Sequence, residues 1–370
     1  MRNRLVVIRE KERRRRYLAA TVAVLLCIFF YWQSVAAWGK LSVFDLLVTI
    51  VSSQSIQFKD QDVQKTREKE ERSDTPLSFA FWSSGGNVSL STVDTMANAD
   101  AELLVVNGRT DLLFPSSTWM DVEDSDGCLI GRSTAIALYG TSEVTGLSLT
   151  YNGKSYIIRG IIKEAANTIV IESSALPEEG MDTATVRTDE TVTLSSLSEQ
   201  VVNQLDFTGE PLDYRSLNEI AHFLTLLLPF LVGVFLLRFL YGEIRQVRKN
   251  RPVNLGMEGY HVNLDSTYLE NLALWWGIFA VAFLILAFML MRNLSISQDM
   301  IPTKWSDFDF WSTFLSRKRE SFFLLLRCEK RQPELYYVGL WRSSVGYSIL
   351  TLTTYVYVRI LIRPFKLNEL

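Results

Sequence analysis

Long apolar stretches constrain this chain more than any other feature. The hydrocarbon core of a bilayer is about 30 Å thick, and a helix rising about 1.5 Å per residue needs roughly 20 apolar residues to cross it. Four stretches fit, with Arg238, Arg342 and Arg359 near their ends, where long basic side chains can reach the headgroups. The predicted transmembrane helices are 18–37, 221–241, 272–291 and 337–362.

The distribution of charge predicts how these helices are oriented. Met1–Tyr17 holds 8 Lys/Arg and 2 Asp/Glu, whereas Trp38–Ile220 holds 13 Lys/Arg and 28 Asp/Glu. Lys and Arg near span ends mark the cytoplasmic side. We therefore expect a multi-pass cell-membrane protein with both termini in the cytoplasm. The predicted segments between the spans are a basic N-terminus (1–17), an extracytoplasmic domain (38–220), a cytoplasmic loop (242–271), an extracytoplasmic loop (292–336) and a cytoplasmic C-terminus (363–370).

Two segments allow a second interpretation. The arginine-rich start followed by an apolar run and Ser34–Ala37 resembles a signal peptide, although the run is long for that role and further spans follow, which favours a retained anchor. The loop 292–336 carries 8 Lys/Arg and 6 acids although it is expected outside. Its apolar patch Phe322–Leu326 can either lie on the membrane surface or pack against the extracytoplasmic domain.

The segment 38–220 is long enough for an independent fold. In 146–162 apolar residues alternate with polar ones around Asn152-Gly153, which predicts a hairpin with a two-residue turn. Residues 127–140 predict a strand, a turn and a short helix that is capped by Ser133 or Thr134 and ends at Gly140. A charged helix or linker is expected over 59–72, with strands at 75–82, 168–172 and 191–197. The fold class is an α-helical membrane protein with a mixed α+β domain inserted between helices 1 and 2.

The sequence contains no recognisable catalytic or metal-binding motif. His222 and His261 have no partner at metal-ligand spacing, and Ser148 stands where a phosphate-binding loop ending in Gly153-Lys154-Ser155 requires a glycine. No Gly-x-Ser-x-Gly phrase occurs. We therefore expect a non-catalytic chain without a metal or cofactor of its own, and a net charge of -3 implies no nucleic-acid partner.

The three cysteines leave one question open. Cys27 lies in the first predicted span, whereas Cys128 and Cys328 are both expected on the oxidising side. They can form a disulfide or remain two separate thiols, and the sequence favours the thiols.

The run 126–165 (DGCLIGRSTAIALYGTSEVTGLSLTYNGKSYIIRGIIKEA) resembles the extracytoplasmic core domain of MacB/FtsX-type ABC transporter permeases. The layout of one span, a large outer domain and three further spans is also similar to that family. The resemblance implies that the motif residues determine the fold of the core domain rather than bind a ligand. These residues are Gly127, Cys128, Gly131, Leu138, Gly140, Gly146, Asn152, Gly153, Arg159 and Gly160.

The resemblance also implies a function. A separate ABC-type ATPase chain, with ATP and Mg bound to it, would contact the cytoplasmic loop. ATP hydrolysis on that chain would move the outer domain and so export or extrude peptides, antibiotics or lipoprotein-like substrates. A second permease copy or a related permease, a membrane-fusion or envelope partner, and membrane lipids are the other expected partners. The residues expected to contact the ATPase are Glu243, Arg245, Arg248, Lys249, Arg251, Asn254, Leu255 and Gly256.

The cytoplasmic loop departs from the family, because Glu243–Arg248 and Asn254–Gly256 only loosely match its usual phrases. The alternative is therefore a membrane-anchored regulatory or sensory protein without transport. Its outer domain would bind an envelope partner such as a cell-wall hydrolase.

Overall fold

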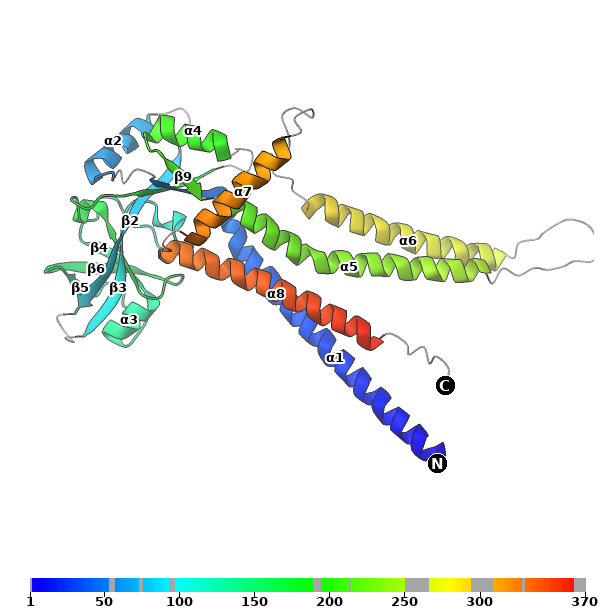
Figure 1. The fold of residues 1–370 in the computed structure, drawn as a ribbon. Helices are drawn as coiled ribbons and strands as arrows, with labels where there is room; N and C mark the ends of the chain where they lie inside the picture. The colour runs from blue at the N-terminus through cyan, green and yellow to red at the C-terminus, as the bar shows by residue number, and fades with distance from the viewer. Residues whose placement is uncertain are drawn as a thin grey trace, which may run out of the picture. The chain divides into compact units, whose positions relative to one another are not determined.

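The computed structural model describes residues 2–52, 57–72, 76–92, 97–188, 194–212, 214–249, 266–293, 309–327 and 330–362. These residues form two compact units, each of which draws on several parts of the chain (Figure 1). The helical unit comprises Met1–Val35, Ala221–Ser297 and Val345–Leu370. The sheet unit comprises Ala36–Ile220 and Gln298–Ser344, so it includes part of the predicted loop 292–336 as well as the predicted domain.

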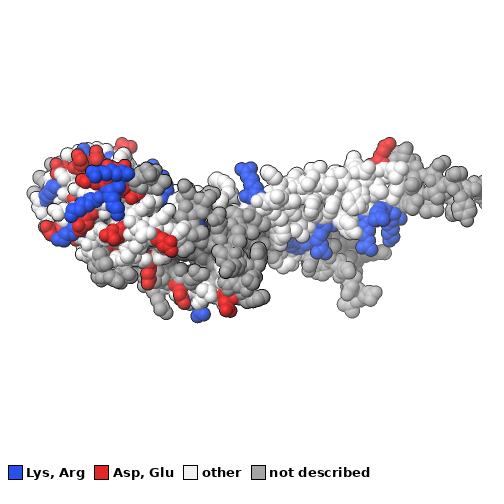
Figure 2. Space-filling view, turned by 90° about the horizontal axis from the view of Figure 1, so that it is seen from above, with Lys and Arg blue, Asp and Glu red and all other residues white. Residues whose placement is uncertain are grey.

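Four helices among the described residues are long and apolar enough to cross a membrane. They are α1 (Arg2–Leu41), α5 (Tyr214–Lys249), α6 (Ser266–Asn293) and α8 (Gln332–Ile362). Each contains one predicted span. Within the helical unit, α5 and α6 approach closely at Gly233, where an added Cβ would lie 2.6 Å from Leu286 Cδ1. Most of the exposed surface of these helices is uncharged, whereas charged side chains crowd the sheet unit (Figure 2).

The sheet unit is built on nine strands in the order β3-β7-β4-β6-β5-β2-β8-β1-β9, and β2 also pairs with β3. Because β2 pairs with β3, β5 and β8, it belongs both to a nearly closed ring of strands and to the extension β8-β1-β9. The strands are β1 (Leu47–Ser52), β2 (Ser78–Ser91), β3 (Asn98–Gly108), β4 (Gly127–Gly131), β5 (Ser148–Tyr151), β6 (Lys154–Ile162), β7 (Thr168–Glu172), β8 (Thr183–Arg187) and β9 (Gly209–Leu212).

Short helices complete the sheet unit. They are α2 (Asp60–Glu71), α3 (Arg132–Tyr139), α4 (Leu194–Leu205) and α7 (Phe310–Arg327), with 3-10 turns η1 (Ser42–Leu46), η2 (Thr110–Leu112) and η3 (Ser173–Ala175). One apolar core packs α3 against the ring of strands and includes Cys128, Leu138 and Tyr156. A second core lies under α2 and α4 and includes Phe81 and Phe207.

The structure confirms the hairpin and corrects two local predictions. Asn152 and Gly153 both have positive φ, at 48° and 77°, as a two-residue turn between β5 and β6 requires. The expected strand 191–197 is wrong over its last four residues, because α4 begins at Leu194, whereas residues 191–193 lie outside the described residues. Its apolar residues follow a helical spacing that buries Val201 and Leu205 in the second core.

The predicted cap of α3 is also wrong, although its predicted end is right. The helix begins at Arg132, after Gly131, and no side chain caps it. The carbonyl of Ala166 instead accepts hydrogen bonds from the backbone N–H groups of Ser133 and Thr134. A neighbouring loop therefore satisfies the free donors that a capping side chain would otherwise satisfy. Gly140 ends the helix in the left-handed conformation, with φ of 72°.

Candidate functional site

The first turn of α8 carries a side-chain cap that fixes where the helix begins. Glu334, at the third position of the helix, accepts a hydrogen bond from the backbone N–H of Arg331 through Oε2 at 2.6 Å. Arg331 occupies the position just before the helix, and its carbonyl accepts the N–H of Leu335 at 2.9 Å. A glutamate reaching back to the residue before the helix is half of a capping box. The residues Arg331-Gln-Pro-Glu334 therefore contain a signal for a helix start. The predicted span 337–362, which rests on hydropathy, did not use it.

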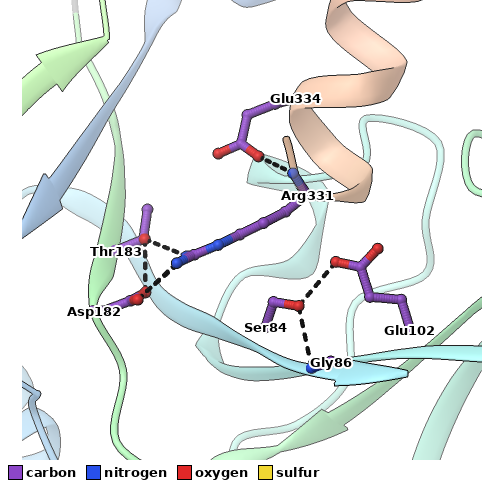
Figure 3. Close-up of polar contacts among 7 residues, drawn as sticks. All are labelled: Ser84, Gly86, Glu102, Asp182, Thr183, Arg331 and Glu334. Atoms are coloured by element: carbon purple, nitrogen blue, oxygen red, sulfur yellow. Dashed lines mark hydrogen bonds and ion pairs between the residues drawn. The ribbon is translucent and has the colours of Figure 1, made fainter. Parts of the chain in front are cut away.

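The side chain of Arg331 joins this helix start to the beginning of β8 (Figure 3). Its Nη1 donates to Asp182 Oδ1 at 2.7 Å, and its Nη2 donates to Asp182 Oδ2 at 2.6 Å. Nη1 also donates to Thr183 Oγ1 at 2.7 Å. This paired geometry is the strongest form of the arginine–carboxylate contact, because both bonds are charge-assisted and share one orientation. We call these residues the Arg331 junction.

The surroundings of the Arg331 junction strengthen it. The guanidinium lies over the ring of Trp82, 5.3 Å from its centroid, and Trp82 in turn donates to Thr185 Oγ1 on β8 at 3.0 Å. Burial by itself would lower the pKa of Arg331, but the hydrogen bond and charge of Asp182 outweigh burial and raise it. The charge of Glu102, which is held by Ser84 at 2.9 Å, acts in the same direction. Arg331 therefore remains charged although it is largely buried.

A second set of contacts holds the first turns of α5 and α8 together within the sheet unit. The hydroxyl of Tyr337 donates to Asn218 Oδ1 at 2.8 Å, and Asn218 Nδ2 donates to Asp45 Oδ1 at 2.6 Å. Trp341 Nε1 donates to the carbonyl of Leu217 at 2.9 Å. These bonds join η1 to the N-terminal parts of α5 and α8.

Within the helical unit, three hydroxyl groups meet where α1, α5 and α8 pack together. Ser34 Oγ lies 3.0 Å from Thr225 Oγ1 and 2.7 Å from Ser348 Oγ, and the last two are 3.2 Å apart. All three side chains are buried. Buried hydroxyls on apolar helices stabilise helix pairs, because lipid offers them no hydrogen-bond partner. We call this group the hydroxyl junction.

A buried polar cluster lies where α2 covers the carboxyl ends of the parallel strands β3 and β7. Asp60 Oδ1 accepts hydrogen bonds from Ser173 Oγ at 2.5 Å and from Asn107 Nδ2 at 3.0 Å. Arg67 donates to Asn107 Oδ1 at 2.6 Å. Burial raises the pKa of Glu172, at the end of β7, to about 9, although the charge of Arg67 and the amide of Gly108 oppose the rise. Glu172 is therefore protonated at neutral pH.

A pocket of about 320 Å³ opens beside this cluster. Its lining is mainly apolar, and the exposed Trp119 lines it together with Arg67 and Glu70 from the last turns of α2. Glu70 is already engaged, since it accepts the backbone N–H of Leu77 at 3.0 Å. Among the described residues, no group of three or more His, Cys, Asp and Glu side chains is placed to hold a metal ion.

The motif residues of the sequence analysis lie together around β4, α3 and the β5–β6 hairpin. Cys128 and Leu138 are buried in the first core. Gly131 packs so closely that an added Cβ would lie within 2.3 Å of the carbonyl oxygen of Ala166. Arg159 pairs with Asp124 at 2.7 Å. Gly127 and Gly160 lie in β4 and β6, Gly140 ends α3, and the others lie in turns: Gly146 before β5, and Asn152 and Gly153 between β5 and β6.

The residues expected to contact an ATPase are only partly described. Glu243, Arg245, Arg248 and Lys249 continue α5 for its last two turns. Arg251, Asn254, Leu255 and Gly256 lie outside the described residues, as do His261 and Cys328. Cys128 is a free, buried thiol, and burial raises its pKa to about 12. Cys27 is also a free thiol.

No family model matches the chain, and no curated protein sequence matches it. A solved structure of the periplasmic region of MacB from Actinobacillus actinomycetemcomitans is similar at 12% identity, over 47% of this chain and 91% of that chain, with a TM-score of 0.37. The extracellular domain of the noncanonic ABC-type transporter YknZ from Gram-positive bacteria is similar at 11% identity, over 45% and 97%, with a TM-score of 0.32.

Proposed function

We propose that this chain is the permease subunit of a MacB/FtsX-type ABC transporter and that it transmits movement between its spans and its sheet unit. The observation that carries the proposal is the Arg331 junction. Helix α8 contributes residues to both units, and its first residues are fastened to β8 by Arg331 and Asp182. A paired, largely buried ion contact resists sliding and rotation better than an apolar contact does, because its geometry is fixed in two directions.

In this proposal the chain itself is not an enzyme. ATP and Mg are bound by a separate ATPase chain in the cytoplasm, which grips the segment that follows α5. The basic residues Arg245, Arg248 and Lys249 at the end of α5 suit such a contact and also suit a cytoplasmic position. Both termini are cytoplasmic and the sheet unit is extracytoplasmic. Two permease copies, or this chain and a related one, form the working assembly.

Co-purification tests the ATPase contact. We expect the full-length protein, extracted in mild detergent from its native cells, to bring down a P-loop ATPase. The double variant Arg245→Glu with Arg248→Glu should lose this partner, because charge reversal turns attraction into repulsion. Lys65→Glu, an equal type of change on α2, is the matched control and should retain it. Wild-type protein that brings down no ATPase would refute the transporter assignment.

The Arg331 junction requires its own test. With Arg331→Ala the ATPase should still co-purify, because the contact lies on the other side of the membrane. Nucleotide-dependent changes in protease sensitivity of the sheet unit should disappear. If Arg331→Ala shows the same nucleotide-dependent change in protease sensitivity as wild type, movement does not pass through Arg331.

The pocket beside α2 favours a second function. A membrane-anchored regulator would use its outer domain to bind an envelope partner, and the exposed Trp119 next to apolar residues is the type of side chain that anchors such contacts. Trp119→Ala should then abolish the cellular effect of the protein, while Arg245→Glu with Arg248→Glu should leave it intact. The transporter proposal expects the opposite result for the charge reversal.

A further inference from the structure

Helix α7 presents an apolar surface that the described residues of the sheet unit leave uncovered. The helix lies against β9. Trp311 is nevertheless 50% exposed and Leu315 is 63% exposed. Residues four positions apart share one face of a helix, so these two side chains form a continuous apolar patch. Contiguous exposed apolar side chains, unlike single exposed residues, are typical of interaction surfaces.

The charge of α7 indicates what it binds. Its 18 residues contain four Lys/Arg and one Glu. The guanidinium of Arg319 lies 5.5 Å from the ring centroid of Phe323, so an exposed cation sits next to an exposed aromatic ring. Helices that combine an aromatic apolar face with Lys and Arg lie in the interface of membranes that contain anionic lipid. A second copy of α7 would bring like charges together, which disfavours pairing between two such helices.

The position of α7 in the chain points to the same surface. It lies between α6 and α8, two of the helices suited to span a membrane. The five peptide steps from Arg327 to Gln332 extend at most about 17 Å. The end of α7 is therefore tethered close to the first residue of α8, on the same side of the membrane as the start of that helix. Tryptophan is enriched at this depth, where its ring contacts acyl chains and its N–H contacts headgroups.

We infer that α7 is an interfacial helix that lies on the extracytoplasmic membrane surface, with Trp311 and Leu315 inserted below the headgroups and Arg319 bound to lipid phosphates. The inference rests on the proposed topology, in which α6 and α8 cross the membrane and the segment between them is extracytoplasmic, and it holds whether or not an ATPase is the partner. Such a contact would set the height of the α8 start, and with it the Arg331 junction, above the bilayer.

Site-specific quenching tests this placement in the full-length chain. An environment-sensitive fluorophore is attached at Leu315→Cys, with Cys328→Ala as background since Cys27 and Cys128 are buried. The labelled protein is reconstituted into vesicles that contain phosphatidylglycerol and nitroxide-labelled lipid. The matched control is Ser316→Cys, whose side chain points about 100° away around the helix. We expect quenching at position 315 to exceed that at 316 by about twofold or more.

Two further measurements complete the design. Arg319→Glu should reduce quenching at position 315 in phosphatidylglycerol vesicles and change it little in phosphatidylcholine vesicles, because only the anionic surface attracts the arginine. Elution volume and thermal unfolding in detergent check that each variant is folded. Equal quenching at 315 and 316 in folded protein would overturn the inference and leave α7 packed on protein. Quenching at 315 that does not respond to Arg319→Glu would overturn the role of lipid phosphates.

Discussion

Arg331 and Asp182 form a paired ion contact, with Nη1–Oδ1 and Nη2–Oδ2 distances of 2.7 and 2.6 Å, between residues 149 positions apart in the chain. Both side chains are largely shielded from solvent, at 21% and 28% exposure. The pair fastens the segment before α8 to β8.

Removing one partner of this pair should destabilise the protein. Arg331→Ala leaves the carboxylate of Asp182 without its cation in a largely buried place, which costs about 3 kcal/mol in comparable buried pairs. Arg331→Lys keeps the charge but loses the paired geometry, so its loss should be smaller. Thermal unfolding of the full-length variants in detergent measures both. Equal stability of Arg331→Ala and wild type would show that the contact contributes nothing.

Disrupting the hydroxyl junction should weaken the packing of α1 against α8. Ser348→Ala removes a hydroxyl that lies 2.7 Å from Ser34 Oγ, and hydrogen bonds of this kind between membrane helices contribute about 1 kcal/mol. The double variant Ser34→Cys with Ser348→Cys should form a disulfide on oxidation, detectable by mass spectrometry of peptides. Ser34→Cys with Thr353→Cys is the control, because Thr353 is exposed on another face of α8. Equal yields from the two pairs would contradict the packing described.

The buried carboxyl of Glu172 should make stability fall as pH rises. Its pKa is raised from 4.5 to about 9, so the folded protein keeps a proton that the unfolded chain releases. Unfolding therefore releases a proton between about pH 5 and pH 9, and higher pH favours the unfolded state, by at most about 1.4 kcal/mol per pH unit. Below this window both states are protonated and the effect vanishes.

The variant Glu172→Gln isolates this effect. Glutamine has nearly the same shape and carries no titrating group, so the variant should show a flatter dependence of unfolding temperature on pH. Its advantage over wild type should grow from pH 6 to pH 8. Parallel pH profiles for the two proteins would mean that Glu172 is not held protonated.

Gly131 should not tolerate a side chain. An added Cβ would lie 2.3 Å from the carbonyl oxygen of Ala166 and 2.6 Å from that of Ala165, and both are backbone atoms that cannot move without displacing a loop. The same Ala166 carbonyl accepts the first N–H groups of α3, so the shift would also uncap this helix. Gly131→Ala should therefore lower the unfolding temperature clearly. Gly39→Ala, where an added Cβ meets nothing within 4 Å, is the control and should have little effect.

Local patterns in the sequence predicted those helices and turns that are determined by residues close together in the chain. The four spans follow from runs of apolar residues, and the β5–β6 turn follows from Asn152-Gly153, because few other residues adopt positive φ at both positions. The strand expected at 191–197 failed for a physical reason. A short segment rich in Ser, Thr and Leu is compatible with either element, and the burial of Val201 and Leu205 against the second core decided for a helix.

The sequence by itself determined that this chain alternates membrane-length helices with an acidic folded domain, since length, hydropathy and charge are summed along the chain. Only the tertiary structure decided that part of the segment after α6 belongs to the sheet unit, that Arg331 meets Asp182, and that Ser34, Thr225 and Ser348 converge. These contacts join residues more than a hundred positions apart. Their partners are selected by the packing of whole strands and helices, which no local pattern of residues records.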